Sequence, residues 1–113
     1  IDKNEACIDW NQPARAIHNR IRGLAMGPAA YTRRAGQPLK LHRAQVLEEE
    51  GVHGAPGEIL VTSSLIPLES GRVAVACSQG VLEVLEVQPE SRSRQAITEY
   101  LRGYPLKAGE RFD

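Results

Sequence analysis

One amphipathic helix with a marked start and a marked end constrains the fold of this chain more than any other feature. Its apolar residues recur at helical spacing and form one stripe, which consists of Ala14, Ile17, Ile21 and Leu24. Its polar residues gather on another side, with His18 at the border, and they are Arg15, Asn19 and Arg22. We expect Asn11 to cap the helix, Pro13 to lie in its first turn, and Gly23 to end it in a left-handed C-cap. Such a stripe is stable only when a second element covers it.

The segments after the helix alternate as short strands do, with glycine turns between them. Residues 31–34 and 37–46 are separated by Ala35 and Gly36 and predict a hairpin. Further strands are expected at residues 58–63, 72–77 and 81–87, and a short helix near residues 95–102. The strand at 81–87 is apolar on both faces, which indicates a central position. The order of these elements predicts a mainly β fold with flanking helices, namely a small antiparallel OB-like open barrel.

Length and composition are those of one globular domain, which we expect to span residues 1–113. The chain is 42% hydrophobic and 25% charged. It has no apolar run of the ~20 residues that span a bilayer and no signal-peptide pattern, so we expect a cytoplasmic protein without a membrane partner. Cys7 and Cys77 are far apart and no histidine clusters with them, so we expect reduced thiols and no metal site.

Charge is distributed unevenly, although the formal net charge is zero. Between Trp10 and Leu47 there is no acidic residue, but seven basic ones: Arg15, Arg20, Arg22, Arg33, Arg34, Lys40 and Arg43. Residues 48–90 carry eight acids and one base, Arg72, and the segment from Ser91 onward is basic again. If the basic segments meet in space, they form a positive face for a polyanion. The alternative is that they pair with acids such as those at 48–50 and leave a mixed surface.

Several motifs, taken in order, resemble one known family. The first is the run IDWNQPARAIHNRIRG at residues 8–23. The others are GQPLKLHRA at 36–44, PGEIL at 56–60, LEVLEVQP at 82–89, YLRG at 100–103 and PLKAGERF at 105–112. This series is similar to the C-terminal domain of methionyl-tRNA formyltransferase and its folate-dependent relatives, and it covers nearly the whole chain. The fold of that family agrees with the OB-like expectation, and the resemblance implies that this chain is a fragment.

The resemblance also implies that the chemistry takes place elsewhere. The catalytic Asn, His and Asp of the family and its formyl-folate site lie on an N-terminal domain, for which this chain has no matching positions. We therefore expect no catalytic residue and no cofactor in this chain, and 10-formyltetrahydrofolate in the whole enzyme. The chain departs from the family in two places. Residues 25–28 keep only the proline of a turn, and a basic position and a helix N-cap are lost among Ser91, Ser93, Gln95 and Ala96.

Seven side chains are the candidates for contact with tRNA phosphates: Arg33, Arg34, Lys40, His42, Arg43, Arg92 and Arg94. Three residues are expected to be structural: Trp10, His18 and Gly23. Trp10 precedes the helix and is expected to pack in the core or at a hinge rather than under a base. His18 is expected to be a hydrogen-bonded histidine at the helix edge rather than a ligand or a catalyst. With five aromatic residues, RNA binding is expected to depend on charge and shape.

The function indicated is that of an accessory tRNA-binding domain of the formyltransferase, which formylates the amino group of methionyl initiator tRNA. Its expected partners are initiator methionyl-tRNA and the N-terminal catalytic domain of the same enzyme, and the fragment alone is expected to be non-catalytic. The alternative is a structural spacer in a related folate-dependent hydrolase, dehydrogenase or sugar formyltransferase, without RNA binding.

Overall fold

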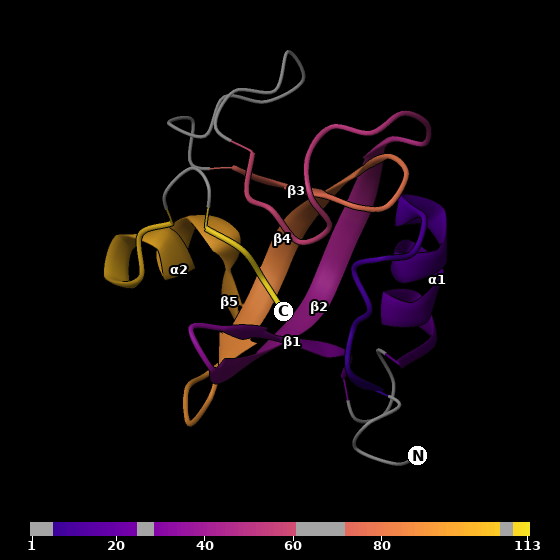
Figure 1. Ribbon diagram of the computed structural model, residues 1–113. Helices are drawn as coiled ribbons and strands as arrows, with labels where there is room; N and C mark the ends of the chain where they lie inside the picture. The colour runs from indigo at the N-terminus through magenta and orange to yellow at the C-terminus, as the bar shows by residue number, and fades with distance from the viewer. Residues whose placement is uncertain (1–5, 25–28, 61–71, 107–109) are drawn as a thin grey trace.

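An antiparallel sheet with a helix at each side forms the described part of the chain (Figure 1). The computed structural model describes residues 6–24, 29–60, 72–106 and 110–113. In chain order the elements are α1 (Ala14–Leu24), β1 (Tyr31–Arg34), β2 (Gln37–Glu48), β3 (Val73–Ala76), β4 (Val81–Pro89), β5 (Gln95–Ala96) and α2 (Ile97–Gly103). The long strands β2 and β4 bend, and the sheet is an open half-barrel (Figure 1). The mainly β, OB-like expectation is confirmed, and the barrel is only half closed.

Strand β4 is the central strand, as its apolar character on both faces predicts. One edge pairs with β2 along nearly its whole length, from Leu39↔Pro89 to Glu48↔Val81. The other edge of β4 pairs with β3 at residues 81–84 and with β5 at residues 86–87. The strand order is therefore β1-β2-β4-β3, with β5 as a second partner of β4. Three irregularities in the β2–β4 register bend β2, as bulges do.

The strand expected at residues 58–63 is described only at its start. Glu58 and Ile59 form isolated bridges, with Arg111 and Val75 respectively. Residues 61–63 lie outside the described residues, as does the turn expected at 25–28.

The β1–β2 hairpin forms as the sequence predicts. Arg34 pairs with Gln37, and the two residues between them both have positive φ, 50° at Ala35 and 81° at Gly36. Two consecutive left-handed residues match the right-handed twist of the flanking strands. The turn sets the register, which places Tyr31 opposite Lys40 and Arg33 opposite Pro38. Side chains of paired residues project to the same face of a sheet, so this register decides which basic groups meet.

Helix α1 has the predicted stripe but neither of the predicted caps. Ala14, Ile17, Ile21 and Leu24 are all buried, as expected. The Asn11 prediction is wrong: its N–H donates to Asp9 Oδ1 at 2.9 Å, the helix begins three residues later, and the Ala14 N–H donates to the Gln79 carbonyl at 2.8 Å. The Gly23 prediction is also wrong, because Gly23 lies inside the helix and is not among the positive-φ glycines. The burial of Leu24 extends the helix past the glycine.

Helix α2 begins close to its expected place, after the unexpected short strand β5. Its N-cap residue, Ala96, makes no side-chain capping hydrogen bond, which confirms that the usual cap is lost. Ile97 and Tyr100 are the buried residues of the helix. Their packing, rather than a cap, therefore holds α2 against β4 and β5.

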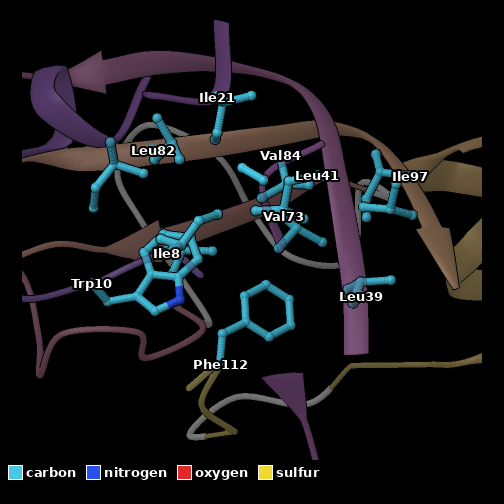
Figure 2. Packing of buried hydrophobic residues seen from close by; sticks show 14 of the residues in the cluster. Ile8, Trp10, Ile21, Leu39, Leu41, Val73, Leu82, Val84, Ile97 and Phe112 are labelled. Atoms are coloured by element: carbon cyan, nitrogen blue, oxygen red, sulfur yellow. The ribbon is translucent and has the colours of Figure 1, made fainter. Parts of the chain in front are cut away.

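The core lies between the sheet and α1 (Figure 2). Residues before α1, such as Ile8 and Trp10, and Phe112 near the end of the chain also belong to it. Trp10 belongs to it: its ring lies 5.9 Å from that of Phe112, and its Nε1–H donates to Thr32 Oγ1 at 2.9 Å. This confirms that Trp10 packs inside. Figure 2 shows both rings within the buried cluster that also contains Leu39 and Leu41 of the sheet.

Residues 110–113 close the core from the other end of the chain. The Phe112 N–H donates to the Gly57 carbonyl at 2.9 Å, and the Arg33 and Asp113 backbones exchange hydrogen bonds of 3.0 and 2.9 Å. Gly57 has a φ of 88°, and a Cβ atom there would lie 2.3 Å from the Phe112 carbonyl oxygen. This position therefore needs a glycine for both its conformation and its close contact.

Candidate nucleic-acid interface

Strands β1, β2 and β4 bring several predicted phosphate-contact residues to one face. Lys40 pairs with Tyr31 of β1 on one side and with Gln88 of β4 on the other. Arg33 lies two residues after Tyr31, so it projects to the same face, and its guanidinium lies 5.5 Å from the Tyr31 ring centre. Arg33 and Lys40 are exposed and form no ion pair within the described residues.

Gln88 connects this face to the turn that carries Arg92. Its side chain lies 2.9 Å from His42 Nε2, and its amide donates to the Arg92 carbonyl at 2.9 Å. The Arg92 side chain is exposed and makes no ion pair in the part of the chain that the structure describes. The hydrogen bond from Gln88 thus holds the Arg92 backbone next to β4.

Glu86 brings together two predicted arginines that lie far apart in the sequence. Arg43 Nη1 is 2.9 Å from Glu86 Oε2, and Arg94 Nε is 2.6 Å from Glu86 Oε1. The arginine side chains are 62% and 51% exposed and the glutamate side chain 23%. Hydrogen bonds from Arg94 and then Arg43 lower the pKa of Glu86, so it is ionised at neutral pH. Two cations on one anion leave a net positive charge that faces water.

We call the set Arg33, Lys40, His42, Arg43, Arg92 and Arg94 the basic face. Its members come from three segments of the chain: β1, β2 and the connection between β4 and β5. The signal that sequence reasoning missed is Glu86, which was counted among the acids of residues 48–90 but holds two members of this face in place.

Arg34 was predicted to contact phosphate, and the structure gives it another task. Its guanidinium donates to the Tyr100 hydroxyl and the Tyr104 carbonyl at 2.9 Å each, and to the Pro105 carbonyl at 2.6 Å. It also lies 3.7 Å from Glu110, and its side chain is 17% exposed. These hydrogen bonds attach the end of α2 to β1, so we leave Arg34 out of the basic face, and its contact with phosphate stays a prediction.

Two other pairs show where basic residues are neutralised. Arg72 lies 2.7 Å from Glu83, whose carboxylate also accepts from Gln45. Burial opposes ionisation of Glu83, but the hydrogen bonds from Arg72 and Gln45 outweigh it and hold its pKa below the ordinary value. Arg15 pairs with Glu49 at 2.9 Å on the surface, as the mixed-surface alternative expects. The charge pairing is therefore real, but within the described segments it does not extend to Arg33, Lys40 or Arg92.

His18 is hydrogen-bonded at the helix edge, as we expected, but at one ring nitrogen only: the ring shares a hydrogen bond with the Ala44 backbone. Its Nδ1 is buried without a hydrogen-bond partner among the described residues. Burial, followed by the charges of Arg15 and Arg22, lowers its pKa, and the hydrogen bond with the Ala44 backbone acts in the opposite direction. The ring is therefore mainly neutral at pH 7.

The described residues offer little for covalent or metal chemistry. No three His, Cys, Asp or Glu side chains among them come together as metal ligands. Burial raises the pKa of the Cys77 thiol to about 12, so it is not a nucleophile at neutral pH. Within the same residues, no helix has the length and apolar character needed to cross a membrane.

Comparison with known proteins adds the family context. The sequence model of the family described as formyl transferase, C-terminal domain, matches residues 1–105. The methionyl-tRNA formyltransferase of Bdellovibrio bacteriovorus is 43% identical over 110 residues, which are 97% of this chain and 33% of that protein. The methionyl-tRNA formyltransferase of Bradyrhizobium diazoefficiens is 38% identical over 116 residues, 99% of this chain and 33% of that protein. This chain thus spans about a third of the length of these relatives.

The fold is also found in solved structures. A crystal structure of HypX from Aquifex aeolicus superimposes with a TM-score of 0.68 over 97% of this chain and 19% of that protein, at 18% sequence identity. A second HypX structure, in complex with tetrahydrofolic acid, gives the same values. At this identity the likeness concerns the fold alone.

Proposed function

Because this chain belongs to the family of formyl transferase C-terminal domains, we propose that it is the RNA-binding part of a cytoplasmic methionyl-tRNA formyltransferase. In this proposal an N-terminal domain transfers the formyl group from 10-formyltetrahydrofolate to the amino group of methionine on initiator tRNA. The present chain binds no folate and holds the tRNA against that domain.

The observation that carries the proposal is the set of unpaired cations on the basic face. Arg33, Lys40 and Arg92 are exposed and without an ion pair in the described structure, and Arg43 and Arg94 share a single carboxylate. Lys and Arg side chains gathered on one surface neutralise phosphates and release counterions, which is the main source of nucleic-acid affinity.

The proposed contacts are with the RNA backbone rather than with bases. In RNA-recognition sheets, exposed aromatic rings stack on unpaired bases. Trp10, Phe112 and Tyr100 are buried, so they cannot stack on bases in this way. Contacts with phosphates fix position without reading sequence. We therefore expect this chain to bind initiator and other tRNAs alike.

The test is a salt titration of tRNA binding by the 113-residue chain. Lys40→Ala and Arg33→Ala should each weaken binding and reduce the slope of log affinity against log salt by about 0.7 to 0.9. Arg111→Ala is the matched control, because it removes an exposed positive charge outside the basic face. Equal effects of all three changes, or no binding by the unchanged chain, would contradict the proposal.

The spacer function is the second candidate, and one observation favours it. The pairs Arg15–Glu49 and Arg72–Glu83 neutralise basic residues, in keeping with a net charge of zero. A chain without tRNA affinity at low salt, in which neither Lys40→Ala nor Arg33→Ala alters activity of the whole enzyme, would be such a spacer.

A further inference from the structure

A pocket of about 510 Å³ lies where helix α1 packs beside strand β2. Its charged and titratable lining comes from two elements, with His18 and Arg22 on α1 and His42 and Arg43 on β2. The apolar side chains of Ile21 and Leu85 also line it. We call it the α1–β2 pocket; it adjoins the basic face through His42 and Arg43.

The charge of this pocket is of one sign. No acidic residue belongs to its described lining, and Arg22 is exposed and forms no ion pair within the described residues. Arg43 donates from Nη1 to Glu86, which is not among the described lining residues. Arginine donates several N–H groups from a planar fork, which suits the oxygens of a phosphate group. Two arginines that line one pocket from different elements can therefore bind one tetrahedral oxyanion together.

His18 supplies a second, independent indication. Its ring is buried enough to favour the neutral form, yet its Nδ1 has no hydrogen-bond partner in the described structure. Buried polar atoms without partners are uncommon in folded proteins. An oxyanion in the pocket would favour a protonated ring, in which the unpartnered nitrogen also carries a proton.

We propose that the α1–β2 pocket binds a phosphate group of the RNA through Arg22 and Arg43, and that His18 takes up a proton from solvent when the group binds. The choice of an RNA phosphodiester over a free phosphate rests on the proposed function, whereas the oxyanion site itself rests on the pocket.

The pH dependence follows from the groups around His18. Arg15 and Arg22 on its own helix and Arg43 from β2 are cations, His42 from β2 is titratable, and Leu85 from β4 is uncharged. Burial, and after it the charges of Arg15 and Arg22, keeps His18 mainly neutral in the absence of an anion. A bound anion, whether the singly charged RNA phosphodiester or doubly charged sulfate, favours the protonated ring, so affinity should rise as the pH falls from about 8 to about 5.5.

The first experiment uses sulfate as the probe, because it stays a dianion over this pH range, and records imidazole NMR signals of the 113-residue chain. The His18 and His42 signals should move together with one dissociation constant, while His53, which is exposed in the loop after Glu50, should not move. Chloride at the same ionic strength is the control. Equal movement of all three histidines, or equal movement with chloride, would overturn the pocket as a site.

The second experiment compares two arginines of the same helix. Arg22→Gln should weaken sulfate binding roughly tenfold, while Arg20→Gln, the same change outside the pocket lining, should leave it within about twofold. Equal losses in both variants would overturn the site.

The third experiment identifies the source of the phosphate. If RNA occupies the pocket, tRNA displaces sulfate, and Arg22→Gln weakens tRNA binding more than Arg20→Gln does. If tRNA and sulfate bind independently, the RNA assignment is overturned and the pocket is a free-phosphate site. If sulfate binds but tRNA does not, the proposed function fails while the oxyanion site stands.

Discussion

The two halves of strand β4 each carry one glutamate that binds arginine, but in different surroundings. Glu83 lies in the half paired with β3, is 1% exposed, and is closed in by Arg72 and Gln45. Glu86 lies in the half paired with β5, where Arg43 and Arg94 reach it from the water side. Enclosure makes the first pair part of the packing, whereas exposure leaves the second pair free to exchange partners. The same kind of contact thus stabilises the fold at one end and presents charge at the other.

The largest effect expected from this comparison is on stability. Glu83→Ala should lower the free energy of unfolding by about 3 kcal/mol, because it removes charged hydrogen bonds from Arg72 and Gln45 and leaves a gap beside β3. Glu86→Ala should cost less than about 1 kcal/mol, since exposed ion pairs contribute little. Urea unfolding followed by Trp10 fluorescence measures both, and similar losses would remove the distinction.

A smaller effect is expected in acid. The folded-state pKa of Glu83 is below its unfolded value, so its contribution is complete above the unfolded pKa of about 4.3 and is lost as the pH falls through the folded pKa. Glu83→Gln should therefore flatten the fall of stability below about pH 4.3. The pKa of Glu86 is lowered as well. Its contribution to stability should shrink with added salt, whereas the contribution of Glu83 should persist. Equal salt sensitivity would mean that Glu83 is not enclosed.

The third test concerns RNA. Glu86→Gln frees Arg43 and Arg94 and should strengthen tRNA binding about fivefold, with a salt slope steeper by about 0.7 to 0.9. Glu83→Gln should leave both quantities unchanged. If Glu86→Gln weakens binding instead, the carboxylate orients the two arginines for RNA, and their exchange of partners is excluded.

The smallest effect is a test of independence. Gly23 lies inside α1 with open space where a Cβ would be, so Gly23→Ala should stabilise the chain by up to about 1 kcal/mol. Glu83→Ala and Glu86→Ala should each lower the free energy of unfolding by the same amount in the Gly23→Ala background as in the unchanged chain. The reason is that Gly23 shares no partner with either carboxylate. Destabilisation by Gly23→Ala would instead mean that the helix ends at the glycine.

Local pattern predicted much of the fold. Three features were predicted because a few neighbouring residues determine each of them: the apolar stripe of α1, the turn at Ala35 and Gly36, and the apolar strand β4. The helix ends were missed because tertiary contacts decide them: the Gln79 carbonyl receives the first N–H, and Leu24 is drawn into the core. Both helix ends therefore depend on contacts between residues that are far apart in the sequence.

The candidate site was less predictable for the same reason. Arg34 reads like Arg33 in the sequence, and only the arrival of Tyr100 and Pro105, 66 and 71 residues later, shows that its donors are occupied. Glu86 likewise reads as one of many acids until the sheet places it between Arg43 and Arg94. A count of charges along the chain indicates that a basic region exists, but the pairing across strands decides which members are available.

The closure of the core by residues 110–113 has a consequence for synthesis on the ribosome. Thr32 donates to the Asp113 carbonyl, 81 positions later, and Phe112 fills the space beside Trp10. Contacts that join distant parts of a chain can form only after the whole span has been made. While residues 110–113 are still inside the exit tunnel, the apolar faces around Trp10 stay uncovered. This domain therefore completes its core only once Asp113 has left the tunnel.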